Sequence, residues 1–168
     1  STVSIGEKPA GATLQEMVPL ALLFLGSFAL DAATQGRSGP LVRAMVATWI
    51  AVRWWKVIHV PPRPGMQSKS LWVAAWTFLA GLWLAGAFPM HATHALHLTF
   101  VGGLGLVTLL VATRVTLSHG GYGAALETTS RALGATAVLA LLAAIVRASA
   151  LLAPGAYLTH LSIAATLW

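Results

Sequence analysis

Three histidines follow one another at even spacing in the segment Met90-His91-Ala-Thr-His94-Ala-Leu-His97. In a helix this spacing places the imidazoles on neighbouring faces of successive turns, and Pro89 suits the first helical position. Imidazole nitrogens beside a thioether suit copper or haem iron better than magnesium or calcium. His91, His94 and His97 are therefore candidate metal ligands. The simpler interpretation is that His91 and His94 are hydrated residues at a helix start, whereas His97 lies one turn further in.

The residues that follow His97 add two features that suit a cofactor. Gly102, Gly103 and Gly105 leave a bare helix face, against which a flat macrocycle or another helix backbone can lie closely. Arg114 ends the uncharged run, and its guanidinium suits a carboxylate such as a haem propionate. Helix packing explains the glycines equally well, and a lone cation at a helix end is ordinary.

The histidines are expected to form two groups on opposite membrane faces. His97 and His119 lie about 33 Å apart along a continuous helix at about 1.5 Å per residue, so they cannot share an ion. Alternation of the helices puts His160 on the face of His97, and His59 on the face of His119. Because a bis-imidazole haem needs ligands from two helices, His97 with His160 is the preferred pair. His94 is the alternative ligand, or forms a copper site with His91.

The elements that must position these residues are helices in a membrane. The chain is 57% apolar and only 8% charged, against roughly 25% charged in soluble domains, and its mean hydropathy is +0.78. Uncharged runs predict an all-α, polytopic transmembrane bundle, one domain over residues 1–168 with five spans and a partial sixth. The spans are expected at about 13–33, 41–60, 70–88, 91–117, 131–152 and, in part, 156–168.

The charges predict an orientation for this bundle. Placing successive loops on alternate sides separates seven cations (Lys8, Arg53, Lys56, Arg63, Lys69, Arg114, Arg131) from three (Arg37, Arg43, Arg147). Since cytoplasmic loops carry the excess of cations, the N-terminus is predicted to be cytoplasmic. This holds if 41–60 crosses the bilayer with Arg43 and Arg53 reaching the headgroups. If that segment lies flat, Trp49, Trp54 and Trp55 become interfacial anchors and the first helix reverses.

Several classes of protein are excluded by composition. Without cysteine, the chain has no thiolate zinc site, iron–sulfur cluster or covalent haem. The net charge of +6 reflects membrane orientation rather than nucleic-acid binding. The four acids Glu7, Glu16, Asp31 and Glu127 are scattered, so no acid–base pair, and hence no enzyme, is predicted.

The segment from His97 to His119 resembles the NnrS family, multi-pass membrane proteins that contain haem and copper and serve the bacterial response to nitric oxide. The resemblance rests on His97, Gly102, Gly105, Thr108, Thr113, Arg114 and His119-Gly120-Gly121, which follow the family pattern without a gap. His91 and His94 are additions to that pattern, and Ser118-His119-Gly120-Gly121 replaces its Gly-His-Thr-Gly close. Family members are longer, so the chain is expected to be a C-terminal half or a shortened relative.

The resemblance implies haem b, copper or both as cofactors, with His97, His119, Arg114, Gly102 and Gly105 among the binding residues. It also implies a bacterial inner-membrane location and a role in nitric oxide stress or nitrogen-oxide metabolism. The alternative is a structural or accessory subunit of a larger respiratory or photosynthetic complex that uses the helices for packing and holds no cofactor; a transporter fragment is a third possibility. The expected partners are lipid and other membrane subunits or the rest of a longer chain.

Overall fold

The computed structural model describes residues 14–34, 38–62, 65–121, 130–150 and 152–167. Every regular element in these ranges is helical, which confirms the all-α fold. The α-helices are α1 (Leu14–Ala33), α2 (Gly39–Arg53), α3 (Met66–Ala87), α4 (Ala92–His97), α5 (Leu106–His119), α7 (Arg131–Ser149) and α8 (Tyr157–Leu167). A π-helix, η2 (Leu98–Gly105), joins α4 to α5, and short 3-10 turns, Pro89–His91 and Pro154–Ala156, precede α4 and α8.

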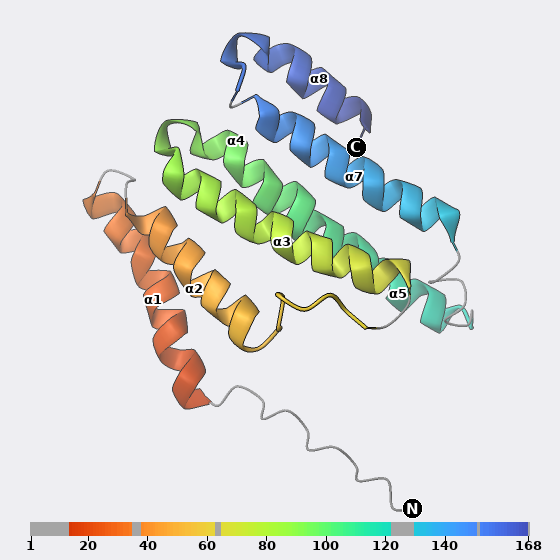
Figure 1. Cartoon of the computed structure of the whole chain (residues 1–168), viewed down its shortest axis with the longest axis horizontal. Coiled ribbons are helices and arrows are strands. Elements are labelled where there is room, and N and C mark those ends of the chain that lie inside the picture. The colour runs from red at the N-terminus through yellow and green to blue at the C-terminus, as the bar shows by residue number, and fades with distance from the viewer. Residues whose placement is uncertain (1–13, 35–37, 63–64, 122–129, 151, 168) are drawn as a thin grey trace, which may run out of the picture.

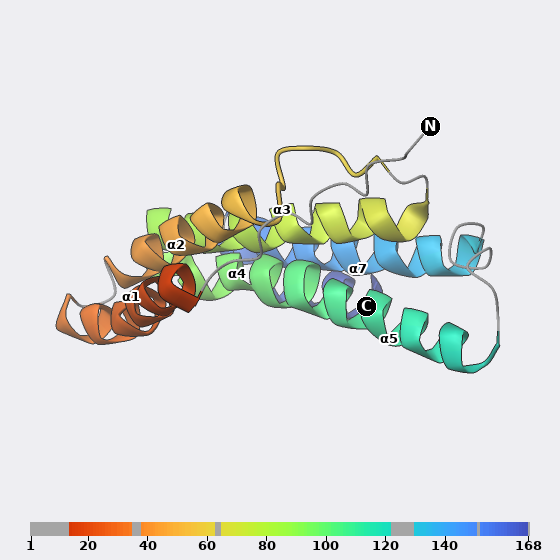
Figure 2. The ribbon, with the colours of Figure 1, turned by 90° about the horizontal axis from the view of Figure 1, so that it is seen from below.

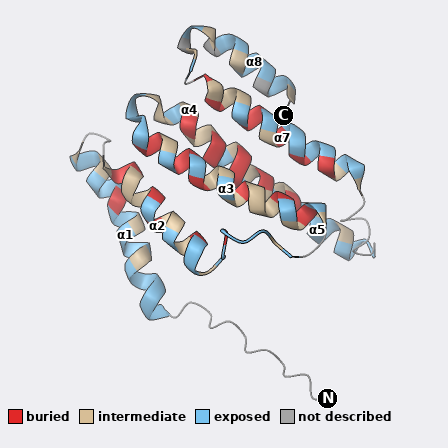
Figure 3. Ribbon diagram, viewed as in Figure 1, coloured by how far each residue is buried: buried red, intermediate tan, exposed pale blue. Residues whose placement is uncertain are grey.

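Successive helices run up and down beside one another (Figure 1). α1 packs on α2, α2 on α3, α3 on α4 and η2, and α7 on η2, α4 and α8. The view from below shows α3 lying over α4 and α5, with α5 diverging from α3 toward its C-terminal end (Figure 2). Buried residues concentrate on α3, η2 and α7, whereas α1 and α8 are mostly exposed (Figure 3). α3 is therefore the central helix of the bundle.

Within the residues that the structure describes, four helical stretches are long and apolar enough to cross a membrane. They are Leu14–Ala33, Met66–Ala87, Pro89–His119 and Arg131–Ser149, and they fall on the expected spans 13–33, 70–88, 91–117 and 131–152. The last segment forms the 11-residue helix α8, about 17 Å long and shorter than the roughly 30 Å of bilayer hydrocarbon.

The expected span 41–60 is the exception, because its helix α2 ends at Arg53 and has 15 residues, about 22 Å of length. Lys56 adopts a positive φ of 52°, and Pro61 disfavours helix at the residue before it. The segment still lies alongside α3 in the antiparallel sense. Trp72 Nε1 donates a hydrogen bond of 2.6 Å to the carbonyl of Val57, so the irregular continuation of α2 stays packed against α3.

Glycines let the backbone of η2 come into close contact with the neighbouring helices. A Cβ on Gly103 would lie 2.7 Å from Phe78 Cβ and 2.9 Å from Phe78 Cα, and one on Gly102 would lie 3.1 Å from Ala144 Cβ. In an apolar solvent such close packing is a principal attraction between helices. η2 is consequently held against both α3 and α7.

Hydrogen bonds reinforce this contact. A π-helix departs from the regular α-helical pairing of carbonyls and amides. Thr77 Oγ1 donates its proton to the carbonyl of Val73 in its own helix at 2.6 Å, and it lies 3.3 Å from the carbonyl oxygen of Gly102. Thr99 Oγ1 donates to the carbonyl of Phe78 at 3.3 Å. Further along, the buried Gln67 Nε2 donates to the carbonyl of Leu110 at 3.2 Å. Side chains thus bond backbone carbonyls across the helix pair that contains the histidine segment.

Replacing Gly103 with Ala tests the close approach. The added methyl group meets the backbone of Phe78, so we expect the free energy of unfolding in mild detergent to fall by about 1–3 kcal/mol. Gly26→Ala is the matched control, because a Cβ there has no neighbour within 4 Å and the better helix former should stabilise α1 by about 0.5–1 kcal/mol. Equal effects of the two substitutions would contradict the packing described here.

Candidate functional site

Four of the histidines gather at one end of the bundle. His91, His94 and His97 lie where the chain turns from α3 into α4, and His160 lies in the first turn of α8, just after α7 ends (Figure 1). His119 ends α5 at the opposite end. His59 lies in the connection between α2 and α3, where it lines a cavity with Ser68 and Trp72. The structure therefore separates His59 and His119 from the other four.

His91 and His94 lie side by side at the start of α4. Their ring centroids are 6.3 Å apart, with the planes tilted by 36°. His94 interacts electrostatically with Arg147 of α7 as well as with His91 and His97, and its Nδ1 atom is buried. The three histidines of this segment, with Arg147 acting on His94 from the end of α7, are called the histidine cluster below.

His97 is held in an orientation that suits ligation. Its Nδ1 lies 2.7 Å from the carbonyl oxygen of Thr93, and since a carbonyl only accepts, Nδ1 carries the proton and donates it. The lone pair is then on Nε2, as in most metal-bound histidines, whose other ring nitrogen donates to a carbonyl or carboxylate. His119 makes the same contact with Val115 at 2.9 Å, so the hydrogen bond alone does not distinguish the two residues.

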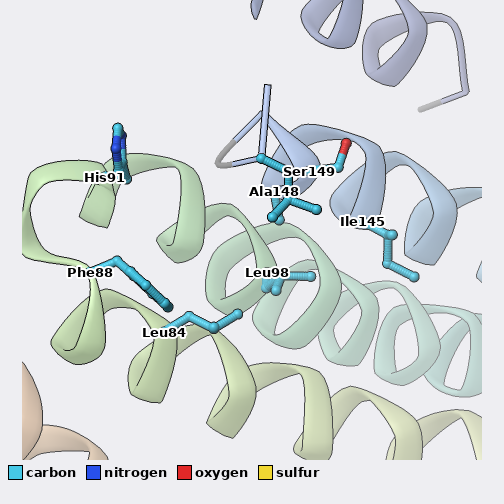
Figure 4. Close-up of a pocket in the computed structure, with 8 residues that line it drawn as sticks. Leu84, Phe88, His91, Leu98, Ile145, Ala148 and Ser149 are labelled. Carbon is cyan, nitrogen blue, oxygen red and sulfur yellow. The ribbon is translucent and has the colours of Figure 1, made fainter. Parts of the chain in front are cut away.

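An apolar pocket of about 370 Å³ opens beside this cluster, between the end of α3, α4 and the end of α7 (Figure 4). Its walls are mainly aliphatic and aromatic, with two polar residues at the edge. They are Leu84, Phe88, Leu98, Ile145, Ala148 and Leu152, with His91 and Ser149 as the polar members. Phe88, Ile145 and Leu152 are exposed, so the pocket is open to the surroundings of the bundle. Its size and lining are those of a small-molecule or cofactor pocket.

Ser149 links this pocket to α8. Its hydroxyl donates to the carbonyl of Val146 at 2.7 Å and lies 3.1 Å from Nδ1 of His160. Because the single hydroxyl proton is used on Val146, the serine oxygen accepts from His160 Nδ1–H. His160 therefore also has its lone pair on Nε2. Ser149 was not predicted from the sequence, where it is one small polar residue at the end of an apolar run.

The structure does not bring all the predicted ligands together. Among the described residues, no three His, Asp or Glu side chains form a group that could hold a metal ion, so His91, His94 and His97 do not converge on one point. α8 packs along α7, and α4 packs against α3 and the other side of α7 (Figure 1). His160 accordingly contacts Ser149, and the pairing of His97 with His160 stays a prediction.

The remaining predicted residues lie further along the same continuous helix. Gly102 is buried against Thr77 and Ala144, so helix packing uses the face that was also suited to a macrocycle. Gly105 is half-buried, and Arg114 and His119 are exposed on α5. Arg147, expected from the sequence only as a cation at a helix end, is instead the guanidinium near His94.

The family model described as NnrS protein matches residues 6–168. The chain belongs to the NnrS family. No curated protein and no solved structure matches it. The family match and the apolar helices indicate a membrane protein of the NnrS type, in contact with lipid.

This NnrS chain also has an ion pair between α1 and α2. Arg43 Nη2 lies 2.7 Å from Asp31 Oδ2, with the two side chains 12% and 27% exposed. The guanidinium carbon lies 4.3 Å from the centroid of the Phe28 ring, and Nη1 lies 3.5 Å from Ser27 Oγ. The expectation that Arg43 reaches outward to headgroups is therefore wrong. A carboxylate on the preceding helix compensates its charge within the bundle, which is the usual way to hold an ionised residue in a span.

Substitution of Arg43 tests how far this pair holds α1 to α2. Arg43→Leu leaves the Asp31 carboxylate without its cation, so we expect a loss of about 2 kcal/mol in the free energy of unfolding, below the 3–5 kcal/mol of a fully buried pair. Arg43→Leu combined with Asp31→Leu removes both charges and should recover most of that loss. A double-mutant cycle in detergent measures the coupling, expected at about 1–3 kcal/mol, and strictly additive effects would mean that the pair contributes nothing.

Proposed function

We propose that this NnrS chain binds haem b through imidazoles at the α4–α7 end of the bundle and takes part in the bacterial response to nitric oxide. The proposal is supported by family membership together with one observation, the apolar pocket that opens directly beside His91 and the histidine cluster. When bound, haem supplies an iron centre that can bind nitric oxide or exchange electrons. The protein supplies axial nitrogens, apolar walls and cations near the carboxylates.

The arrangement of donors favours haem over a three-imidazole copper site. Copper held by His91, His94 and His97 needs all three to converge, which they do not among the described residues. Haem needs one or two axial imidazoles and an apolar surface for its ring. His97 is our first ligand, because its Nδ1–H is engaged by Thr93 and Nε2 has the lone pair. His91 at the pocket and His160 on α8 are the candidates for a second ligand.

Arg147 acts electrostatically on His94, within the histidine cluster. It is therefore our candidate for the carboxylates of the macrocycle. Arg114, which the sequence suggested for this role, lies about 25 Å further along the helix from His97 at about 1.5 Å per residue. The guanidinium of Arg147 gives this end of the bundle a positive charge that suits a propionate.

The absorption spectrum of the purified protein tests this proposal. We expect a Soret band that is lost in His97→Ala and kept in the matched control His59→Ala, because His59 lies in the α2–α3 connection away from the cluster. Loss in His91→Ala or in His160→Ala would identify the second ligand. A colourless protein that co-purifies with a larger complex would instead support the role of a structural subunit, and a Soret band retained without His97 would overturn the ligand assignment.

We further propose that the chain is a multi-pass protein of the bacterial inner membrane with a cytoplasmic N-terminus. The cation count supports this orientation. The end of the bundle that holds the histidine cluster would then face the periplasm. Exposed apolar residues on α8, such as Leu158 and Ile163, suit contact with the rest of a longer chain or with another membrane subunit.

Single cysteines test the orientation, since the chain has none of its own. Lys69→Cys at the start of α3 and His119→Cys at the end of α5 are expected to react with an impermeant maleimide only after the membrane is permeabilised. Met90→Cys, at a position 92% exposed between α3 and α4, should react in intact cells. Reaction of Lys69→Cys from outside would reverse the orientation, and reaction of all three from one side would contradict the crossing of α3.

A further inference from the structure

An apolar groove of about 480 Å³ lies between α1, α2 and α3, on the opposite side of α3 from the histidine pocket. Met17, Phe24 and Leu25 line it on α1, Ile50 on α2, and Leu79 on α3. From Met17 to Leu25 it follows α1 for about 12 Å. α1 packs mainly on α2, so its divergence from the bundle leaves this space against α3.

Beside the groove lies a second cavity of about 480 Å³ that has a different lining. The two cavities share Trp55 and Ala75. The second one contains Lys56, His59 and Ser68, where the first has apolar residues. Taken together, the two adjacent cavities form a composite space that is apolar at one end and offers a cation, an imidazole and a hydroxyl at its polar end.

The charges at the polar end are predominantly positive. Lys56 lines the polar cavity, and Arg53, three residues before it at the end of α2, is exposed; the acid in the first turn of α1 is Glu16. Asp31, the other described acid on α1, lies at the far end of that helix and pairs with Arg43. The polar end thus suits an anion.

Trp55 lies where the two cavities meet, and it is 67% exposed. Tryptophan is enriched at the level of the headgroups in membrane proteins. Lys69 precedes the uncharged part of α3, which begins at Ser70, so the polar cavity lies at the height where the bilayer changes from headgroup to hydrocarbon.

We propose that this composite space is a binding site for one anionic phospholipid. An acyl chain occupies the groove between α1, α2 and α3, and the phosphate lies at Lys56, His59 and Ser68. Free phosphate would use only the polar cavity, and an apolar helix of a partner would have no use for its cations. A lipid matches both parts and their order along the membrane normal, which is why the occupant is assigned to this class.

Native mass spectrometry measures the selectivity of the site for an anionic lipid. The detergent-solubilised protein is titrated with phosphatidylglycerol or with phosphatidylcholine that has the same acyl chains. We expect phosphatidylglycerol to bind at least fivefold more tightly. Lys56→Gln should weaken phosphatidylglycerol binding about fivefold and leave phosphatidylcholine unchanged, which is the effect of removing one lysine near an anionic headgroup. Ala75→Phe should weaken both lipids, because Ala75 lines both cavities.

Matched controls lie elsewhere on the bundle. Arg131→Gln removes an exposed cation at the start of α7, and Ala112→Phe adds a ring on the exposed face of α5; neither should alter lipid binding. Glycerophosphoglycerol, which has the headgroup and no acyl chains, should not compete. Three outcomes would each overturn the proposal. They are equal binding of the two lipids, equal losses of lipid binding in Lys56→Gln and Arg131→Gln, and competition by glycerophosphoglycerol. If Ala75→Phe does not fold, the comparison of Lys56→Gln with Arg131→Gln decides.

Discussion

The close approach of η2 to α3 is the contact on which the rest of the bundle depends. In lipid there is little hydrophobic drive between helices, so packing at backbone distance and hydrogen bonds across the interface have to hold them together. Gly103 on η2 allows the close approach, and the hydroxyl of Thr99 donates a hydrogen bond to the carbonyl of Phe78 on α3. Because η2 also packs on α7, the same eight residues fix the position of α7. A larger side chain at Gly103 would separate α3 from the helix that carries the histidines.

This contact also determines where the candidate site lies. η2 begins directly after His97, and π-helical segments are rare and often occur at functional sites. Holding η2 between α3 and α7 places the start of α4 against the end of α7, which brings His94 near Arg147 and encloses the pocket beside His91. Beyond η2, α5 diverges from α3 (Figure 2). The packed end of the bundle therefore holds the pocket with histidines.

The sequence predicts the features that depend on local composition. A long run without charged residues, such as 70–88, forms a helix whose ends lie close to those expected from the sequence. The end of α2 was missed because apolar residues continue past Arg53 to Val60, interrupted only by Lys56 and His59, while Lys56 and Pro61 set the backbone path. The Asp31–Arg43 pair was missed because each residue alone fits an interfacial position, and only the antiparallel packing of α1 on α2 shows that they meet. From the sequence, the bare face at Gly102 could pack equally well against a macrocycle or against another helix. In the structure it packs against helices, through contacts with Thr77 and Ala144.

α3 separates the two sites proposed for this protein. Leu84 and Phe88, near its C-terminal end, line the pocket with the histidines, whereas Ser68 and Ala75, in its N-terminal half, line the space assigned to a lipid. α3 packs against α2 on one side and against η2 on the other, so a ligand in either site can affect the other only by moving this helix. The glycine contact resists such movement, because shifting α3 along η2 would bring side chains against the backbone at Gly81 and Gly103. The two sites are consequently expected to bind independently, with the lipid positioning the α1–α2 pair and the histidine cluster responding only to what enters its own pocket.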